Sequence, residues 1–491
     1  MKVLVANRGE IALRIMRTCR EMGLKTVAVY SEGDNKAQHT RYADESVCIG
    51  PAPAAESYLR IERILDAAQQ TGAQAIHPGY GFLSENTAFA QAVEDAGLIF
   101  IGPRPETIAL TGDKLAARKV ARQAGLPVLP GPDEPVQDSL TGDLIHNVTF
   151  PMLVKAVAGG GGRGIRLANN QAELVDMVAA ARQEARAAFG DDAVYLEPLV
   201  QRARHIEIQI IGDGHGQVIS VGERECSIQR RRQKLIEEAP APNLSRTMRN
   251  ELLSAAVRLG ESLNYRGLGT VEFLLDHSGH YYFIEVNPRI QVEHPVTEMV
   301  AGVDLVRAQL ELAQNGRLKW RQDQIIPRGW AIEARVLAED PSQGFLPAIG
   351  EITHLREPAG PGIRVDSALF LGMQVTVDYD SLIAKVIAWA EDRPSAISRL
   401  QRGLSDFQIG GIPTDIGFLQ QVLESPSFMA GRADTTYLDT FHPAEPLNRE
   451  DVEREVALMA ALLTDQSRRQ AQTLPMGSED NWLQTAWREQ M

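Results

Sequence analysis

The chain has 491 residues, of which 44% are hydrophobic and 23% are charged, and its formal net charge is −14. This composition is typical of a soluble globular protein, and the length is enough for about three domains. The acidic balance argues against a general nucleic-acid binder, although a local basic pocket can still take an anionic ligand.

Cys19, Cys48 and Cys226 are scattered along the chain and form neither a metal-binding spacing nor a disulfide framework. Isolated thiols of this kind fit a reducing compartment. The N-terminal MKVLVANRGE lacks the long apolar stretch of a signal peptide, and no window reaches transmembrane length. We therefore expect a cytoplasmic protein that does not bind a membrane.

Residues 1–110 alternate strand-like and helix-like segments. The short apolar runs are KVLVAN, TVAVYS, ESVCIG, AIHPGY and IFIGP, and helical periodicity lies between them in IALRIMRTCREMG and YLRIERILDAAQQTG. Such alternation predicts a parallel sheet covered by helices. The single glycine of VANRGE is not a dinucleotide-binding fingerprint.

A helix is expected at GDKLAARKVARQAG, and a glycine loop follows in PMLVKAVAGGGGRGIRLA, residues 151–168. The loop contains a formal G-x-G-x-x-G at Gly159, Gly161 and Gly164, but a strand follows where a Rossmann turn needs a helix. We interpret the segment as a hairpin whose glycine amides can wrap phosphates, with a simple flexible turn as the alternative.

The segment RHIEIQIIGD reads as a strand with His205, Glu207 and Gln209 on one face. Several cations follow it, a charge run that a solvated surface would also explain: Arg224, Arg230, Arg231, Arg232 and Lys234, with Arg204 nearby. Helices are expected near 246–265, 303–316, 394–407 and 450–470, and strands within 329–390.

Polar side chains recur at every second residue in FIEVNPRIQVEHPVTEM, residues 283–299. On a strand they would share one face, while Val286, Ile290 and Val292 would share the other. A solvated strand face would look similar, but carboxylate and amide oxygens suit Mg²⁺ and arginine suits an oxyanion. The polar residues are Glu285, Asn287, Arg289, Gln291 and Glu293.

A second carboxylate is expected beside Glu285. If GTVEFLLDHSGHYYFIEVN forms a hairpin with Leu275 opposite His280, Glu272 faces Phe283 and lies diagonally from Glu285, about 7–8 Å away. Two carboxylates that close would leave one protonated unless a divalent cation separates them. A register slip of one residue would place them on opposite faces.

Long motifs of the chain resemble those of biotin carboxylase, the ATP-grasp component of biotin-dependent carboxylases. They are ANRGEIALRI (6–15), HPGYGFLSEN (77–86), RHIEIQ (204–209), ECSIQRR (225–231), QKLIEEAPAP (233–242), NPRIQVEHPVTEM (287–299), EARVLAEDP (333–341) and DYDSLIAK (378–385). The resemblance implies that MgATP phosphorylates bicarbonate to carboxyphosphate, and that N1′ of biotin is then carboxylated, the first half-reaction of a biotin-dependent acyl-CoA carboxylase.

The same resemblance implies an α/β and α+β multidomain fold: an N-terminal parallel-sheet (pre-ATP-grasp) domain at 1–112, an ATP-grasp domain at 113–325 with a lid near 131–203, and a C-terminal mixed-sheet domain at 326–445. A helical tail at 446–491 is a candidate partner contact. The implied partners are a biotin carboxyl carrier, a carboxyltransferase and a second copy of the chain. No lysine lies in a Met-Lys-Met acceptor motif, so the carrier is expected on another polypeptide or further along a longer chain.

The resemblance also assigns residues to ATP and its Mg²⁺ (or Mn²⁺). Glu272 and Glu285 correspond to metal ligands, assisted by Asn287. The ATP-binding positions are Lys114, Lys155, Gly161, Gly162, Glu197, Pro198, Leu199, Val200, His205, Gln229 and Arg232. Arg232 replaces a histidine that is usual in the family, which keeps a cation but removes its sensitivity to pH.

For bicarbonate, the matching residues are Lys234, Arg289, Gln291 and the backbone amide of Val292. Glu293 corresponds to the general base and Arg335 to the residue that stabilises the biotin enolate, and Tyr80 and Asp380 correspond to further positions around biotin. No step needs Cys226, which we interpret as a packing residue. Two rival functions remain: another ATP-grasp enzyme that activates bicarbonate or a carboxylate, and a non-catalytic nucleotide-binding subunit.

Overall fold

The computed structural model describes residues 1–132, 134–136, 150–158, 165–444 and 457–464. The chain separates into two compact units, Met1–His442 and Pro443–Met491. In the second unit the structure describes one helical segment, 457–464. No helix among the described residues is long and apolar enough to span a bilayer.

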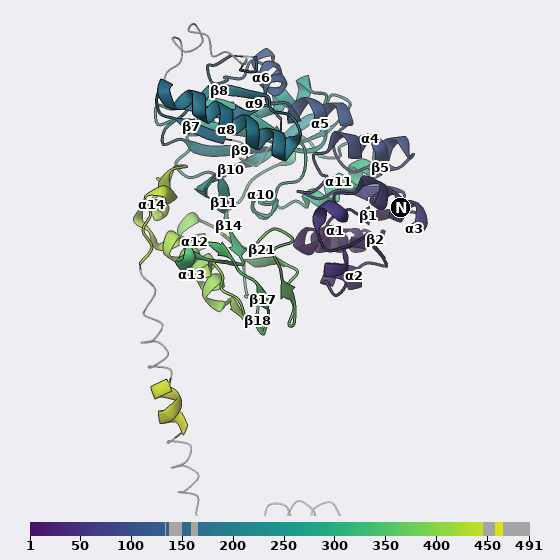
Figure 1. The fold of residues 1–491 in the computed structure, drawn as a ribbon, viewed down its shortest axis with the longest axis vertical. Helices are drawn as coiled ribbons and strands as arrows, with labels where there is room; N and C mark the ends of the chain where they lie inside the picture. Colours follow the sequence, from purple (N-terminus) through teal and green to yellow (C-terminus); the bar gives the residue numbers. More distant parts are fainter. Residues whose placement is uncertain (133, 137–149, 159–164, 445–456, 465–491) are drawn as a thin grey trace, which may run out of the picture. The chain divides into compact units, whose positions relative to one another are not determined.

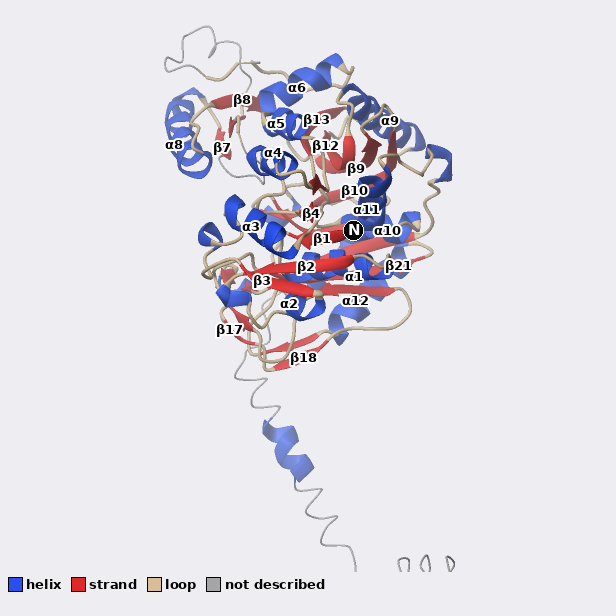
Figure 2. Cartoon of the chain, turned by 90° about the vertical axis from the view of Figure 1, so that its right-hand side faces the viewer, coloured by secondary structure: helices blue, strands red, loops and turns tan. Residues whose placement is uncertain are grey.

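The N-terminal sheet is parallel throughout, with strand order β3-β2-β1-β4-β5, as the alternating pattern predicts (Figure 2). Val3 and Val5 pack with the helix α1 on one face of the sheet, while Leu4 packs on the other face. The elements are β1 (Lys2–Val5), α1 (Gly9–Glu21), β2 (Lys25–Tyr30), α2 (Gln38–Tyr42), β3 (Glu45–Cys48), α3 (Ile61–Thr71), β4 (Ala75–His77), α4 (Thr87–Asp95), β5 (Ile99–Phe100), α5 (Pro105–Gly112) and α6 (Lys114–Gln123).

A small three-stranded sheet, β7-β6-β8, contains the strands on either side of the glycine loop. β6 (Met152–Ala156) and β7 (Ile165–Ala168) pair antiparallel, which confirms a strand–loop–strand arrangement rather than a Rossmann turn. β8 (Val194–Pro198) pairs with the other edge of β6, and α8 (Gln171–Phe189) covers the sheet (Figure 1). The loop itself, residues 159–164, lies outside the described residues.

The largest sheet has eight strands in the order β13-β12-β9-β10-β11-β14-β21-β19, and every pair in it is antiparallel. The expected fold class holds, but the mixed sheet expected for the C-terminal domain is wrong, because β14, β21 and β19 extend the antiparallel sheet. The strands are β9 (Arg204–Asp213), β10 (Val218–Arg230), β11 (Gln233–Ala239), β12 (Arg266–Leu275), β13 (Tyr281–Asn287), β14 (Trp330–Leu337), β19 (Ile363–Ser367) and β21 (Leu382–Ala390).

Helices cover both faces of this sheet. α9 (Arg246–Ser262) packs on β9 and β10, while α12 (Arg393–Asp406) and α13 (Ile416–Glu424) pack on the face of β14 that carries Ile332, Ala334 and Val336. The opposite face of β14 meets α10 (His294–Ala301). The remaining elements are α11 (Leu305–Asn315), α14 (Pro426–Met429), β15 (Glu339–Asp340), β16 (Leu346–Pro347), β17 (Gly350–Glu351), β18 (His354–Arg356), β20 (Gln374–Val375) and β22 (Gln408–Gly410).

Candidate functional site

Two carboxylates face each other across β12 and β13, because Glu272 pairs directly with Glu285. The hairpin turn is one residue out of the expected register, since Leu275 pairs with Tyr281. This slip alone would turn Glu285 away from Glu272, but a β-bulge leaves Ile284 unpaired and restores the facing. The two acids are therefore closer than the diagonal placement expected.

The polar row after Glu285 does not continue along one strand, which corrects the expected strand face. β13 ends at Asn287, because Pro288 has no N–H for the ladder. The side chains still converge: Arg289 donates to Gln291 and, at 3.0 Å, to Asn287 Oδ1. Gln291 Nε2 in turn lies 3.2 Å from Glu272 Oε1. A turn, not a strand, brings this part of the row together.

The pKa values of the facing acids shift in opposite directions. Burial raises the pKa of Glu285, and the charge of Glu272 raises it further. Burial would also raise the pKa of Glu272, but Lys234 and His205 hold it below its usual range. The repulsion between the two carboxylates thus appears as a raised pKa of Glu285 alone, as expected. The buried Glu272 carboxylate and the half-buried Glu285 carboxylate, beside the Asn287 amide, form a hard-oxygen donor set that fits a divalent cation.

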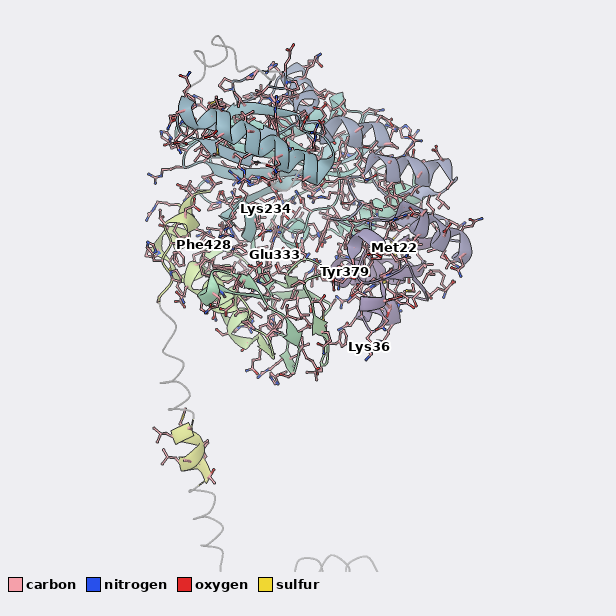
Figure 3. The ribbon with its side chains drawn as sticks, viewed as in Figure 1. Met22, Lys36, Lys234, Glu333, Tyr379 and Phe428 are labelled. Carbon is pink, nitrogen blue, oxygen red and sulfur yellow. The ribbon has the colours of Figure 1, made fainter. Side chains whose placement is uncertain are left out.

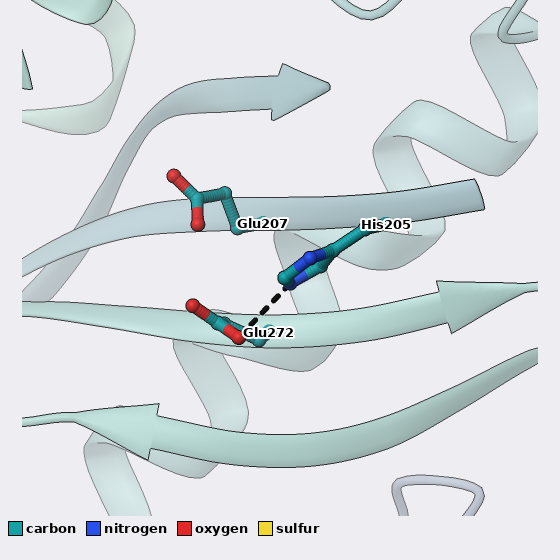
Figure 4. A group of neighbouring side chains, drawn as sticks. All are labelled: His205, Glu207 and Glu272. Carbon is teal, nitrogen blue, oxygen red and sulfur yellow. Dashed lines mark hydrogen bonds and ion pairs between the residues drawn. The ribbon is translucent and has the colours of Figure 1, made fainter. Parts of the chain in front are cut away.

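A lysine stands among three carboxylates next to this pair. Lys234 Nζ lies 2.6 Å from Glu207, 3.1 Å from Glu272 and 2.6 Å from Glu293. His205 Nε2 lies 2.9 Å from Glu272 Oε2 (Figure 4). His205, Glu207 and Glu272 could together reach one metal ion, but the Lys234 ammonium already pairs with both of these carboxylates. We interpret this group as an ion-pair network, and His205 as a partner of a metal-ligand candidate rather than a free ribose contact.

Glu293 is held between two cations. Lys234 contacts one oxygen, and Arg335 Nη2 lies 2.9 Å from the other. Despite burial, Lys234, Arg335 and Arg224 hold the pKa of Glu293 well below its usual range. Arg335 Nε also donates to Glu237 at 2.6 Å, and burial raises the pKa of Glu237 to about 7. Glu293 is therefore anionic but a weak base while both cations bind it.

Arg224 is a central residue that sequence reasoning left within a charge run. It is fully buried and donates to Glu207, to Gln209 Oε1 and Thr297 Oγ1 at 2.9 Å each, and to Thr270 Oγ1 at 3.1 Å. These partners come from two strands, β9 and β12, and from α10. One feature of the sequence could have identified it. Cys226 and Ile228, which would share its face of a regular strand, are apolar and indicate a buried face.

On the expected ATP side, Lys155 is 7% exposed and its ammonium binds the buried Glu197. Arg118, which sequence reasoning missed, binds the other oxygen of Glu197. The side chain of Glu197 is thus engaged within the protein, and the hinge offers backbone groups at the end of β8. The other hinge residues, Pro198, Leu199 and Val200, are half-buried.

The other expected ATP positions are spread around this region. Lys114 begins α6, and burial lowers its pKa although Glu285 opposes the shift. Gln229 pairs with Lys234 across β10 and β11. Arg232 is exposed in the turn between those strands, with φ +67. Gly161 and Gly162 lie outside the described residues.

The expected biotin residues are only partly brought together. Tyr80 donates to Glu10, and burial raises the pKa of Tyr80 well above its usual value while nearby Arg335 opposes the shift. Asp380 is exposed before β21, where it accepts the Leu382 amide at 2.8 Å. Among the described residues, the bonds of Asp380 are local and reach neither Tyr80 nor Arg335.

Glu85 is a further residue that sequence reasoning missed. It lies in the HPGYGFLSEN loop of the N-terminal sheet and pairs with Arg289 Nε. Cys226 is buried, and burial raises its pKa well above the usual value, as expected for a packing thiol. Glu85 shows that loops from distant parts of the chain meet at this site.

Three family models match consecutive parts of the chain. They are "Biotin carboxylase, N-terminal domain" at residues 1–108, "Carbamoyl-phosphate synthase L chain, ATP binding domain" at 113–321 and "Biotin carboxylase C-terminal domain" at 333–440. Each covers elements that contribute to the site.

Curated relatives and solved structures agree. A biotin carboxylase of Nostoc sp. is 51% identical over 438 residues, covering 89% of this chain and 98% of the relative, and biotin carboxylase 1 of Bacillus subtilis is 47% identical over 444 residues, covering 90% and 98%. A Campylobacter jejuni biotin carboxylase complex with β,γ-ATP superposes with a TM-score of 0.87 at 45% identity, covering 90% of this chain and 98% of that chain. A biotin carboxylase domain dimer of the Hydrogenobacter thermophilus 2-oxoglutarate carboxylase, with MgADP, ADP and bicarbonate, also gives 0.87 at 46%, covering 89% and 97%. The chain belongs to the biotin carboxylase family, whose members are ATP-dependent ligases that form a C–N bond.

Proposed function

We propose that the cluster around Lys234 activates bicarbonate with ATP and passes the carboxyl group to N1′ of biotin. The observation that supports this most is that two groups of acids lie side by side. One is the facing pair Glu272 and Glu285. The other is Glu293, which Lys234 and Arg335 bind. One set suits a cation and the phosphates it accompanies. The other suits a small anion that must lose a proton.

Glu272 and Glu285, with Asn287, would hold Mg²⁺. When bound, the ion neutralises phosphate oxygens and favours transfer of the γ-phosphoryl group. Lys155 lies at the ATP side, where Glu197 and Arg118 keep its ammonium oriented inside the protein. These residues position the nucleotide so that bicarbonate oxygen can attack the γ-phosphorus and ADP can leave.

Bicarbonate would compete for the cations that now bind Glu293. In the structure, Lys234 and Arg335 suppress the basicity of Glu293. If bicarbonate draws Lys234 toward its own oxygens, and Arg289 assists, the carboxylate regains basicity and can take the bicarbonate proton. Arg335 is then available to the ureido oxygen of biotin as negative charge develops there. Substrate binding thus switches the base on.

The finer assignments follow from family membership. We infer that biotin arrives on a carrier protein or domain, and that a carboxyltransferase uses the product. The Hydrogenobacter thermophilus domain is a dimer, and we propose the same state for this chain, which light scattering on the purified protein would test. The acid that is finally carboxylated depends on the transferase.

The decisive experiment measures ADP release with and without bicarbonate and free biotin. ATP cleavage should require bicarbonate and rise with biotin, and carboxybiotin should form. Cleavage that ignores biotin while another acceptor is carboxylated would defeat the proposal.

Arg335→Ala distinguishes the nucleotide site from the biotin site. We expect ADP affinity, measured by calorimetry, to stay within about twofold, while carboxybiotin formation falls by about 100-fold or more, as for loss of one oxyanion-stabilising donor. Equal loss of nucleotide binding and carboxylation would contradict the role given to Arg335.

A further inference from the structure

Lys385 is a completely buried cation without a role in the reaction described above. Its exposure is 0%, and it lies on β21 directly opposite Arg335 on one side and Asp366 on the other. Its ammonium lies 2.8 Å from the Val292 carbonyl oxygen and 3.1 Å from Glu10 Oε1. A buried ammonium is costly unless its donors are used, and these contacts use two of the three.

The Val292 carbonyl belongs to the peptide that continues into Glu293. This peptide lies in the turn between β13 and α10, outside the strands that the structure describes. The Lys385 ammonium therefore supplies a fixed point for the segment that carries the base. A charge-assisted hydrogen bond is suited to this because it is stronger than a neutral one.

Glu10 links Lys385 to Tyr80, one of the residues proposed to contact biotin. It lies on α1 of the N-terminal sheet and accepts from both Lys385 and the Tyr80 hydroxyl. Lys385 Nζ also lies 5.9 Å from the centre of the Tyr80 ring. A short chain of contacts thus runs from Tyr80 through Glu10 and Lys385 to Val292.

We propose that Lys385 is a positioning residue that fixes the Val292–Glu293 peptide for bicarbonate, and that Glu10 couples this peptide to Tyr80. Biotin contact at Tyr80 then reaches the bicarbonate turn through two side chains. The inference rests on the proposed function, because it assumes that Tyr80 faces biotin and that the turn holds bicarbonate.

The test compares Lys385→Met with the double variant Lys385→Met/Glu10→Gln. The single change leaves Glu10 buried without its cation, whereas the double change removes both charges and protects folding. In both, we expect the KM for bicarbonate to rise about tenfold or more, as for loss of a charge-assisted hydrogen bond, with the KM for MgATP within about twofold. Biotin stimulation of ATP cleavage should fall in both variants.

The matched control is Arg393→Met/Glu238→Gln, which removes a largely buried ion pair between α12 and β11, with N–O distances of 2.7 and 2.9 Å. It should lower the Tm while leaving the bicarbonate KM and biotin stimulation as in the wild type. Equal bicarbonate KM values in the folded double variant and the control would overturn the positioning role.

Tyr80→Phe tests the coupling, because it removes only the hydroxyl that reaches Glu10. It should reduce biotin stimulation in the wild-type background and change nothing further in Lys385→Met/Glu10→Gln. Additive effects would refute the coupling. Wild-type protein without bicarbonate-dependent, biotin-stimulated cleavage would instead refute the proposed function.

Discussion

Charged side chains at the site lie beside partners of opposite charge. A substitution that removes one charge should therefore change one property of the protein more than the others. Lys234 on β11 and Glu333 on the neighbouring β14 lie near the centre of the first compact unit (Figure 3). Glu333 is fully buried opposite Glu237, and burial raises its pKa well above the usual value. Burial and neighbouring carboxylates thus raise the pKa of Glu333 and Glu237, whereas Lys234 holds the pKa of Glu272 and Glu293 below the usual range.

Glu285→Gln should weaken Mg²⁺ dependence more than it weakens folding. The substitution removes a ligand charge and also relieves repulsion from Glu272. We expect the Mg²⁺ concentration for half-maximal ADP release to rise at least about tenfold, the size seen even for lost support of metal ligands. Glu223→Gln, at a buried acid paired with Arg249, is the control. An unchanged Mg²⁺ requirement would remove Glu285 from the metal site.

Asp415→Asn should stabilise the protein increasingly as pH rises. Asp415 Oδ1 accepts the Leu337 amide at 2.8 Å, and Oδ2 is buried without a partner among the described residues. Burial, aided by Glu339, raises the pKa of Asp415 well above the usual value. Because the folded acid binds its proton more tightly than the unfolded one, its stability contribution is complete below about pH 4 and is lost as pH rises through the folded pKa.

Asparagine keeps the acceptor and has no charge. The gain in unfolding free energy over wild type should therefore grow above pH 4, by up to about 1.4 kcal/mol per pH unit until the folded pKa is reached. Urea unfolding at pH 5, 6, 7 and 8 measures it, with the exposed Asp95→Asn as the control. A difference that does not change with pH would contradict the assignment.

Among the secondary-structure elements, the β12–β13 hairpin shows how one irregularity decides chemistry. Tyr281 and Phe283 pack in the same core as Val286, although a regular strand would place Val286 on the other face. The bulge at Ile284 changes the parity, so that the core residues stay inside while Glu285 turns to Glu272.

Deletion of Ile284 should therefore preserve the facing of the two acids. Phe283 and Glu285 would then be adjacent and would pair in regular register with Phe273 and Glu272. We expect a folded protein whose Mg²⁺ requirement stays within about tenfold of wild type, less than the loss of a ligand would cause. A folded deletion variant without Mg²⁺-dependent cleavage would mean that the local twist of the bulge is itself required.

The local pattern of apolar residues was enough to predict the secondary structure of the N-terminal sheet. The five parallel strands and the helices between them follow from apolar runs in the first 110 residues. The bulge at Ile284 could not be predicted from local pattern, because it depends on tertiary packing. Val286, near the end of β13, packs in the same core as Tyr281 and Phe283. The partners of Arg224 and Lys385 lie on separate strands and on α1, so no window of sequence contains both ends of those contacts.

The matched family region ends near the boundary between the two compact units of the whole chain. The last family model ends at residue 440, and the first unit ends at His442. Within that unit, Tyr437, Leu438 and Phe441 pack against the core formed by β14, β21 and the helices that cover them. Residues after His442 are therefore expected to be dispensable for the reaction, whereas those just before it support the fold.

Two truncations test this boundary. A chain that ends at His442 should keep ADP release and its stimulation by biotin within about twofold of wild type, because every contact described at the site lies within residues 1–442. A chain that ends at Thr436 loses three apolar side chains from the core and should lose about 2 kcal/mol or more of unfolding free energy. Equal stability of the two truncations would show that the last packed segment contributes nothing, and loss of activity in the longer one would place part of the machinery in residues 443–491.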